Sequence, residues 1–594
     1  RSVLLYYPAD PMDWFTTVVS TLEYYVWTFG VPAAGETIPI IVIALLGTGV
    51  FLTLRLAFIQ VRRLGHGFAV TSGRYDDPSE PGDVPHFQAL TTALSATVGI
   101  GNIAGVAIAI HFGGPGALFW MWVTAFLGMA VKYSEVTLAQ HFRQVEFADQ
   151  DPHAWEGSVS GGPMYYIERG LGPKWKPMAI FFAGALMVTS FLTGNAVQAN
   201  TVADTMLDEF GIPVWLTGLV TAAIVAAVIL GGIRRIGRVT AVLAPVMAVI
   251  YVTGALVILG IFYDQVLPAF ALIFREAFQP TAGVAGTGVG VFLTTMMWGV
   301  RRGLFSNEAG QGSAPIAHAA AKTDEPVSEG AVALLEPFID TLVICTLTGL
   351  VVVATGVYQE RIPTAIGLLG GDLSYVEQTP DGAWRGAAPP EAIAVEQGHP
   401  RGGPVIAWHE VAVDRFFTDR QQTEPFHGTI YPGRFAEDVA GERYRTLYGM
   451  AVESGAPLTK LAFQKGLPGT AGRFIVVFSV LLFAISTAIS WSYYGDRCAN
   501  YLWGPKAILP YRVVFVGMHF VGAVTTLATV WAIGDIALGF VTFPNLVALV
   551  LLSGLVVKLT KSYFERRPWE ENLRVHRQVV AERRRGSGRP GDSG

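Results

Sequence analysis

Residues 87–112 form an apolar stretch long enough to cross a lipid bilayer, and its middle is unusual for a continuous helix. Gly99, Ile100, Gly101 and Asn102 stand there. Two glycines beside an asparagine favour a helix whose backbone opens at mid-membrane depth. Because the bilayer core offers no water to unpaired N–H and C=O groups, such an opening is stable only against protein, water or a ligand. Many secondary transporters hold small substrates and ions at breaks of this kind, so the stretch indicates transport.

A second apolar stretch, residues 286–320, contains a comparable interruption. Between Trp298 and Gly310 it carries polar residues that are costly in contact with lipid: Arg301, Arg302, Asn307 and Glu308. Close packing between helices is the alternative explanation for the glycines of both stretches. Packing does not explain amide and charged side chains at the same depth. We therefore expect two broken helices that face each other inside a bundle.

The composition indicates a polytopic membrane protein. Of the 594 residues, 52% are hydrophobic and 15% are charged, whereas about a quarter are charged in a typical soluble domain. Cys345 and Cys498 lie in or beside apolar runs and support neither a disulfide framework nor a metal cluster. No removable signal peptide and no nucleic-acid partner are expected. The lipid bilayer is the expected surrounding of the chain.

Eleven apolar ranges reach spanning length, and together with the loops they predict a topology. Lysine and arginine concentrate in alternate connections and in the C-terminal tail, and the positive-inside rule places these segments in the cytoplasm. The N-terminus is then outside and the C-terminus inside a cell membrane. The predicted spans are 37–60, 87–112, 117–142, 177–207, 213–232, 238–263, 286–320, 332–357, 472–496, 511–532 and 535–558.

The spans suggest a duplicated organisation with a large outer insert. After the first span, ten remain, and each set of five opens with one of the broken helices. An odd number of spans per set makes the two sets opposite in orientation, which is the pattern of an inverted repeat. The predicted parts are an N-terminal segment with one extra helix (1–86), a first repeat (87–263), a second repeat (264–357 and 472–558), an extracellular insert (358–471) and a basic cytoplasmic tail (559–594).

Several sequence blocks resemble the alanine/glycine:cation symporter family, the sodium–alanine carriers of bacteria and archaea. The blocks are Val98-Gly-Ile-Gly-Asn-Ile-Ala-Gly105, Gly113-Gly-Pro-Gly-Ala-Leu-Phe-Trp-Met-Trp122, Gly161-Gly-Pro-Met-Tyr-Tyr166, Arg302-Gly-Leu-Phe-Ser-Asn-Glu-Ala-Gly-Gln-Gly312 and Ser486-Thr-Ala-Ile-Ser-Trp-Ser-Tyr-Tyr-Gly495. The resemblance implies an all-α, leucine-transporter-like fold of five plus five inverted helices, with one extra N-terminal helix. It also implies import of alanine or glycine with sodium, or occasionally with protons. The insert is much longer than the family's connection, so its residues receive no inherited role.

The resemblance places a substrate site at the first break. Backbone amides around Ile100 and Gly101 would bind the substrate carboxylate, because a helix N-terminus presents free N–H groups to an anion. Phe305 and Trp491 would restrict the pocket to a small side chain, the alternative being ordinary packing. Asn195 and Asn200 would bond neighbouring helices. The substrate-binding set is then Gly99, Ile100, Gly101, Asn102, Gln198, Phe305 and Trp491.

The same resemblance places a sodium site between the hydroxyls of Ser486 and Thr487 and the carbonyls of Ser95 and Val98. Sodium is a hard cation that prefers oxygen ligands, and these groups supply oxygens without a buried net charge. Without the resemblance, a hydroxyl in a membrane helix more commonly bonds its own backbone.

Charged residues near the second break are expected to pair. Arg301, Arg302 and Glu308 would form an ion-pair set that gates the cytoplasmic path or stabilises the break. Lys132 and Glu135, one helical turn apart, would form an internal pair. A lone buried glutamate can also carry a proton, so proton coupling stays open beside sodium coupling.

The sequence therefore predicts a cation-coupled importer of a small neutral amino acid that works by alternating access. The alternatives are another small zwitterion or a proton on the same fold, a membrane-embedded enzyme, and a sensor or channel. His111 and His318 fall within the spans in no catalytic arrangement, which disfavours the enzyme. The sequence does not indicate the oligomeric state.

Overall fold

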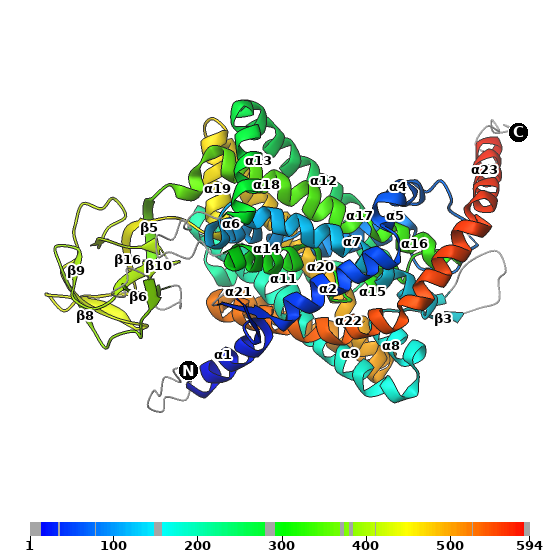
Figure 1. The fold of residues 1–594 in the computed structure, drawn as a ribbon, viewed down its shortest axis with the longest axis horizontal. Coiled ribbons are helices and arrows are strands. Elements are labelled where there is room, and N and C mark those ends of the chain that lie inside the picture. The colour runs from blue at the N-terminus through cyan, green and yellow to red at the C-terminus, as the bar shows by residue number, and fades with distance from the viewer. Residues whose placement is uncertain are drawn as a thin grey trace, which may run out of the picture.

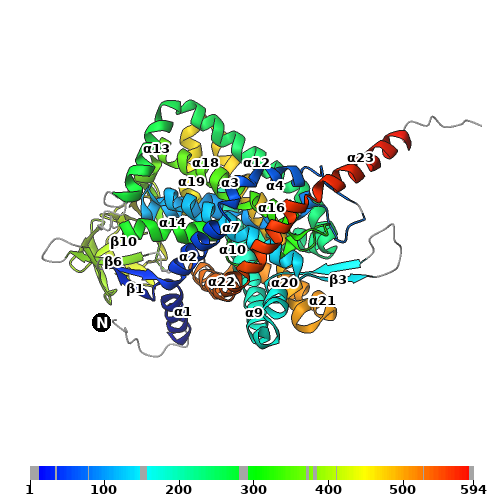
Figure 2. The same ribbon diagram turned by 45° about the vertical axis from the view of Figure 1, so that its right-hand side comes forward.

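The computed structural model describes residues 13–33, 36–77, 79–147, 157–279, 292–368, 373–378, 384–409, 411–525 and 527–586. Helices make up a bundle whose long axis is horizontal in Figure 1. A β-rich insert projects from one end of the bundle, here called the insert end. Helix α23 projects from the opposite end, here called the tail end, and the turned view in Figure 2 keeps the two apart.

The bundle is built from two runs of helices. The first run is α1 (Asp13–Trp27), α2 (Ile40–Arg55), α3 (Ile59–Arg62), α4 (Leu64–Thr71), α5 (His86–Thr97), η1 (Gly101–Gly105), α6 (Val106–Gly113), α7 (Ala117–His141), α8 (Pro163–Leu171), η2 (Pro173–Trp175), α9 (Lys176–Phe191), η3 (Leu192–Ala196), α10 (Val197–Phe210), α11 (Val214–Ile229), α12 (Gly232–Ile261) and α13 (Tyr263–Phe278). The second run is α14 (Phe292–Asn307), α15 (Ala314–His318), α16 (Pro326–Ala333), α17 (Leu335–Pro337), η4 (Phe338–Cys345), α18 (Thr346–Thr355), η5 (Val357–Gln359), α19 (Gly455–Gly466), α20 (Ala471–Trp503), η6 (Pro505–Ala507), α21 (Ile508–Val524), α22 (Leu527–Arg566) and α23 (Trp569–Gly586).

The helices are those of a polytopic membrane protein. Within the described residues, seven helical segments are long and apolar enough to cross a bilayer, and the bent pair α5 and η1–α6 makes eight. Helices α2 and α11 are apolar but shorter. A helix lies in each of the eleven predicted ranges, while length and composition together support this smaller number of spans.

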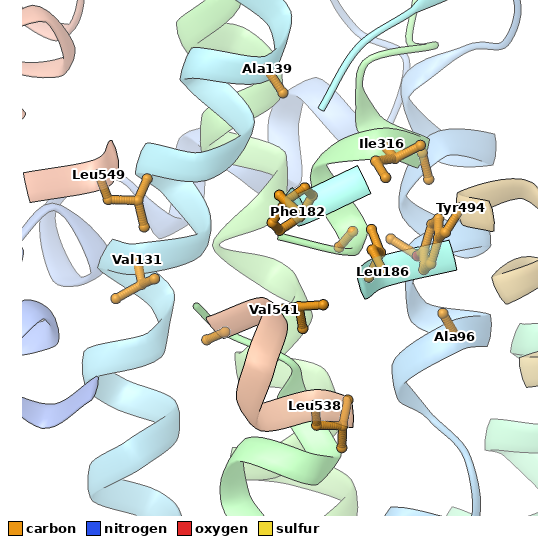
Figure 3. Packing of buried hydrophobic residues seen from close by; sticks show 14 of the residues in the cluster. Ala96, Val131, Ala139, Phe182, Leu186, Ile316, Tyr494, Leu538, Val541 and Leu549 are labelled. Atoms are coloured by element: carbon orange, nitrogen blue, oxygen red, sulfur yellow. The ribbon is translucent and has the colours of Figure 1, made fainter. Parts of the chain in front are cut away.

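The outer surface of the bundle is apolar where a soluble protein would be polar. On α12, Val242, Val249 and Leu256 expose 66%, 65% and 55% of their surface, whereas Thr240 on the same helix is fully buried. Because lipid is the solvent on this face, branched apolar side chains turn outward and polar groups turn inward. The apolar interior lies between helices such as α7, α9 and α22, and Figure 3 shows Val131, Phe182 and Leu549 in it.

The insert corrects the all-α prediction, because it consists of short antiparallel strands. These are β5 (Ile362–Gly367), β6 (Leu373–Gln378), β7 (Trp384–Gly386), β8 (Ile393–Glu396), β9 (His399–Arg401), β10 (Val405–Trp408), β11 (Val411–Ala412), β12 (Phe416–Phe417), β13 (Gly428–Tyr431), β14 (Phe435–Asp438), β15 (Arg443–Tyr444) and β16 (Thr446–Ala451). They form three sheets, ordered β11-β10-β6-β7, β12-β16-β5 and β15-β14-β13-β8-β9. Ile366, Ile393 and Phe416 belong to its separate apolar core. Two small hairpins, β1 (Gly30–Ala33) with β2 (Glu36–Pro39) and β3 (Gln144–Phe147) with β4 (Gly157–Ser160), lie outside the insert.

Within the described part of the bundle, three π-helical turns interrupt the helices. They are η1 after α5, η3 between α9 and α10, and η4 before α18. A π-turn widens the helix and re-aims the side chains after it, and such turns are frequent at functional sites. The turn η1 contacts both η4 and α14. This central region is where the predicted site residues lie.

Candidate functional site

The first predicted break is present. Helix α5 ends at Thr97, and the following helix, which begins around Ile100 and Gly101, is bent by 52° from it. The side chain of Asn102 turns back, and its Oδ1 accepts the Gly99 N–H at 2.8 Å. A Cβ at Gly99 would lie 2.7 Å from the Thr487 hydroxyl oxygen, so only glycine allows this close approach. The first N–H groups after the break lack partners inside their own helix, as at every helix start.

The second predicted break is also present. Helix α14 ends at Asn307, and Glu308 follows with a left-handed φ of +54°. The carboxylate of Glu135 holds the opened backbone, since its Oε1 accepts the N–H groups of Gly310 and Gly312, each at 3.1 Å. A non-glycine residue in left-handed backbone costs free energy, and such strain concentrates at functional sites.

A cavity lies between the two breaks. Its volume is about 10 Å³ in this conformation, roughly the room one water molecule needs. An amino acid therefore requires the lining to move apart. Eight predicted residues line the cavity: Gly99, Ile100, Gly101, Gln198, Phe305, Glu308, Thr487 and Trp491. The sequence did not predict the other lining residues, which are Ala96, Thr97, Thr193, Gln311 and Leu538.

Two amide side chains in the lining have spare hydrogen-bond acceptors. The Nε2 atoms of Gln198 and Gln311 donate to the carbonyls of Thr193 and Leu304 at 3.1 and 3.0 Å. Within the described residues, the Oε1 atoms of both glutamines are buried without a hydrogen-bond partner. Since a buried acceptor without a partner is costly, these oxygens suit a ligand that brings N–H donors.

Two aromatic rings narrow the cavity. The indole of Trp491 packs so tightly on Gly194 that a Cβ there would approach it to 2.3 Å. Its Nε1 donates to Glu308 Oε1 at 3.0 Å, which ties the ring to the second break. The ring of Phe305 lies against Gly101, where a Cβ would be 3.0 Å away. Both rings are fixed by close contacts on the cavity wall.

The residues predicted to hold sodium are mostly brought together. Thr487 Oγ1 donates to the Ser95 carbonyl at 3.0 Å, and Ser486 Oγ reaches the same oxygen at 3.4 Å. Thr487 also approaches the Ala96 carbonyl at 3.3 Å, a group the sequence analysis missed. Among the described contacts, no hydrogen bond joins Val98 to either hydroxyl; Val98 is the residue that follows the end of α5.

A sodium ion fits this group of oxygens. Ser95 Oγ is buried and, among the described residues, has no hydrogen-bond partner. Together with the two hydroxyls and the carbonyls of Ser95 and Ala96, it gives a set of neutral oxygens of the kind a hard cation prefers.

The predicted ion-pair set of Arg301, Arg302 and Glu308 is wrong. Arg302 pairs with Asp535 of α22 at 3.0 Å, and Arg301 approaches Glu23 of α1 at 3.7 Å. Glu308 instead accepts hydrogen bonds from Trp491 and Ser313. The arginines lie inside α14 and reach neighbouring helices, whereas Glu308 lies past the helix end in left-handed backbone and points elsewhere.

The contacts of α14 also show on which side of the cavity Arg302 lies. Trp298, one turn before Arg302 on α14, stacks on Phe112 at the end of α6 with ring centroids 4.7 Å apart. The neighbouring His111 contacts the insert, because its Nε2 is 2.8 Å from the His409 carbonyl oxygen. Arg302 therefore lies between the cavity and the insert end.

The predicted pair of Lys132 with Glu135 is likewise wrong. Lys132 Nζ bonds Glu336 Oε2 at 3.1 Å. Glu135 is occupied by the amides of the second break and by Asn545 Nδ2 at 2.5 Å. The spacing of the two residues along one helix suggested the pair. In the structure, each residue instead contacts groups on other parts of the bundle.

Asp340 in η4 is a central residue that the sequence analysis missed. Its Oδ1 accepts Asn102 Nδ2 at 2.5 Å, and its Oδ2 accepts the hydroxyls of Ser306 and Thr341, each at 2.7 Å. It thereby joins both broken helices to a third element. An aspartate inside the predicted span 332–357 was the available signal, because ionisable residues in spans are functional by default.

The amides of Asn195 and Asn200 bond neighbouring helices, as predicted. Asn195 Nδ2 donates to the Phe515 carbonyl at 2.7 Å, and Asn200 Nδ2 donates to that of Thr525 at 2.6 Å. Both acceptors lie on α21 or at its end.

Comparison with known proteins agrees with this geometry. The family model described as the sodium:alanine symporter family matches residues 17–374 and 443–577. The chain belongs to this family. The matched ranges hold both breaks and the cavity, whereas the unmatched residues 375–442 hold β7 to β14 of the insert. A member of this family is a cation-coupled amino-acid transporter and not an enzyme.

Individual relatives in the sodium:alanine symporter family support the assignment. The chain is 38% identical to the sodium/alanine symporter AgcS of Methanococcus maripaludis over 93% of this chain and 98% of that protein. It is 31% identical to the putative sodium/proton-dependent alanine carrier protein YrbD of Bacillus subtilis, over 88% and 89% of the two chains. It is 30% identical to the probable sodium/glutamine symporter GlnT of the same organism, over 88% and 87%.

Proposed function

We propose that the chain imports alanine or glycine together with sodium by alternating access. The observation that carries this proposal is the cavity between the two breaks, which combines amide donors, amide acceptors and an adjoining set of neutral oxygens. The amide donors complement the substrate carboxylate, the amide acceptors complement its ammonium group, and the neutral oxygens complement the sodium ion.

The substrate is held by its two charged ends. The amide N–H groups at Ile100 and Gly101, at the start of a helix, bind the carboxylate. The Oε1 atoms of Gln198 and Gln311 accept from the ammonium group. Once the lining has moved apart to admit the substrate, Phe305 and Trp491 restrict its side chain to a methyl group or a hydrogen and exclude longer side chains. A relative is named for glutamine, but the narrow cavity favours a smaller substrate here.

Sodium binds beside the substrate at the Ser95 and Ala96 carbonyls and the hydroxyls of Ser486 and Thr487, with Val98 at the end of the same helix. Thr487 also lines the cavity, so the ion and the substrate share one wall. An ion that orders the backbone around the break therefore favours substrate binding, and the coupling is reciprocal. A proton is the alternative coupling ion.

The eleven predicted spans form two inverted five-helix repeats, 87–263 and 264–357 with 472–558, behind one extra helix in the cell membrane. The broken helices open the two repeats, which is the arrangement expected around a central site. The insert 358–471 then lies outside, and the tail 559–594 lies in the cytoplasm. With this topology, the Arg302–Asp535 pair closes the outer path and not the cytoplasmic path that the sequence suggested.

Uptake into proteoliposomes tests the proposal. Radiolabelled alanine should accumulate under an inward sodium gradient and not when potassium replaces sodium. Unlabelled glycine should compete strongly, and glutamine weakly. Uptake driven equally well by potassium, or competition by glutamine as strong as by glycine, would contradict the proposed ion or the proposed substrate.

A further inference from the structure

A continuous line of ionisable side chains crosses the interior of the bundle between the cavity and the tail end. Its members come from five helical elements, of which α16 and α17 belong to one continuous segment, and each member exposes 3% of its surface or less. In order, they are His86 of α5, Glu329 of α16, His318 of α15, Glu336 of α17 and Lys132 of α7. We call these five residues the buried relay.

Every neighbouring pair in the buried relay is within hydrogen-bond distance. His86 Nδ1 bonds Glu329 Oε2, and the other oxygen of Glu329 lies 2.5 Å from His318 Nδ1. His318 Nε2 lies 2.6 Å from Glu336 Oε1, and Glu336 Oε2 lies 3.1 Å from Lys132 Nζ. Each carboxylate thus uses both oxygens, one toward each neighbour.

His318 is the informative member, because both of its ring nitrogens face a carboxylate. A histidine that only neutralises one acid needs one such contact. An imidazole bonded at both nitrogens can take a proton at one and release a proton from the other. Buried ion networks are also weak evidence for added stability, since desolvation offsets much of the attraction. The two carboxylate contacts of His318 therefore indicate a role in proton transfer in addition to stabilising the fold.

The end of the relay that is distant from the cavity lies beside a loop at the tail end of the bundle. His86 is within electrostatic range of Asp76 and Glu80, which precede α5. Burial raises the pKa of Glu80 to about 7, so this carboxyl exchanges protons near neutral pH. Asn572 of α23 donates to Glu80 at 3.2 Å, which places this end beside the tail.

The inner end of the relay lies beside the second break, because Glu135, one helical turn after Lys132 on α7, accepts the N–H groups of Gly310 and Gly312. Lys132 is within electrostatic range of Glu308 and Glu135, and Glu308 lines the cavity. Both oxygens of Glu308 accept hydrogen bonds, one from Trp491 and one from Ser313. A proton on Glu308 removes one of these acceptors and so changes the contact that holds the Trp491 ring.

We propose that the buried relay is a proton path between Glu308 in the cavity and the tail end, so that a proton moves with each transport cycle. This inference rests on the proposed amino-acid transport and adds the proton as a second coupled ion. Within the described residues, the other charged or titratable groups that face the relay or its ends are Asp76, Glu80, Glu135, Arg143, Lys322, Asp324, Asp340, Tyr494 and His576.

The transfer steps balance without any further reactant. Glu308 gives its proton to the Lys132 amine after that amine has passed a proton to Glu336. Glu336 passes the proton to His318 Nε2, and His318 releases its Nδ1 proton to Glu329. Glu329 passes it to His86, and from there it leaves by the loop carboxyls. The ring of His318 then holds its remaining proton on Nε2 and returns to the other tautomer before the next transfer.

The test measures protons and alanine in the same vesicles. Proteoliposomes loaded with a pH-sensitive dye receive alanine, with sodium equal on both sides, and the proton change is divided by the alanine taken up. We expect alanine to move protons in the wild type and His318→Gln to lower the proton-to-alanine ratio by about tenfold or more. The glutamine amide nitrogen can still donate a hydrogen bond to a carboxylate, but the side chain cannot relay a proton.

His519→Gln is the matched control, because this buried histidine bonds Asn195 and Thr221, away from the relay. Its proton-to-alanine ratio should equal that of the wild type. His86→Gln, at the far end of the relay, serves as a second variant, and sodium-dependent alanine binding checks that each variant folds. An unchanged ratio in either folded relay variant, or no alanine-driven proton movement in the wild type, overturns the relay. Loss of sodium-dependent alanine uptake in the wild type contradicts the proposed function instead.

Discussion

The bundle and the insert fill their interiors in opposite ways. The centre of the bundle holds buried ionisable groups such as Lys132, Glu336 and Asp340, all shielded from solvent. The insert has an apolar core and keeps its ion pairs at the surface, for example Arg401 with Glu396. Burying a charge is costly unless partners or function compensate for it. In the described residues, the bundle therefore buries charged groups at its centre, and the insert keeps them at its surface.

The family comparison follows the same division. The sodium:alanine symporter family model covers the bundle and both ends of the insert, and leaves residues 375–442 unmatched. The first and last strands of the insert, β5 and β16, pair along their whole length and so form a stalk for the rest. Most of the insert therefore lies outside the part of the chain that the family model covers, and the following predictions test this difference.

The largest effect is expected at the sodium site in the bundle. Thr487→Ala removes a hydroxyl that lies between the Ser95 carbonyl and the cavity. Because a hydrogen bond or ligand to a charged group contributes about 1.5–3 kcal/mol, sodium-driven alanine uptake should fall by roughly tenfold or more. Uptake at several sodium concentrations measures the loss. The control is Thr355→Ala, whose hydroxyl bonds only the backbone of its own helix, and an equal loss there would remove the distinction.

A clear but smaller effect is expected at the aromatic wall. Phe305→Leu widens the cavity beside Gly101. Larger neutral amino acids should then compete with alanine several-fold better, because one methylene group changes the discrimination between two substrates by about 1–3 kcal/mol. Competition by leucine measures this change. Phe191→Leu replaces a ring that packs on Tyr511 and Phe515 and should leave the selectivity as it was. An equal gain in both variants would mean that the ring does not set substrate size.

Shortening the insert should change transport little. Gly367 and Thr446 are directly paired, and Leu368 N–H donates to the Arg445 carbonyl at 2.9 Å, so a two-residue turn can replace residues 369–444. Asn-Gly suits this turn, since it closes two-residue hairpins well. Sodium-driven uptake should stay within about threefold of the wild type, because surface elements outside a site contribute little to its free energy. Complete loss of uptake in a folded protein would make the insert part of the transport machinery.

The smallest effect is a pH response where the insert meets the bundle. Burial lowers the pKa of His409 to about 4, from a usual value near 6.5. The contact therefore favours neutral His409, and its stability is full above about pH 6.5 and falls as the pH drops toward 4. The protection of amides at the end of α6, which is the hydrogen-exchange rate corrected for its intrinsic pH dependence, should accordingly be lower at pH 5 than at pH 7.5. His409→Gln should abolish most of this difference, and an unchanged difference would assign it to another group.

The sequence predicted the parts of the site that depend on local backbone. Glycines beside Asn102, and the polar run before Glu308, required broken helices, and both breaks are present. Partners on other helices could not be predicted, because they depend on how helices pack. Lys132 illustrates this: its neighbour along the helix was the expected partner, yet Glu336, 204 residues away, is the actual one.

The insert and Asp340 were missed for different reasons. Strands of two to six residues leave too short a pattern to fix their pairing from the sequence. Asp340 was visible as an acid inside an apolar span, but its ties to Asn102 and Ser306 appear only once three elements converge.

The most direct test of the account is the mutual dependence of sodium and alanine binding in the purified protein. The account predicts that sodium tightens alanine binding, that alanine tightens sodium binding by the same factor, and that Thr487→Ala removes the coupling in both directions. Alanine affinity that stays the same with and without sodium would contradict a shared wall between the two sites.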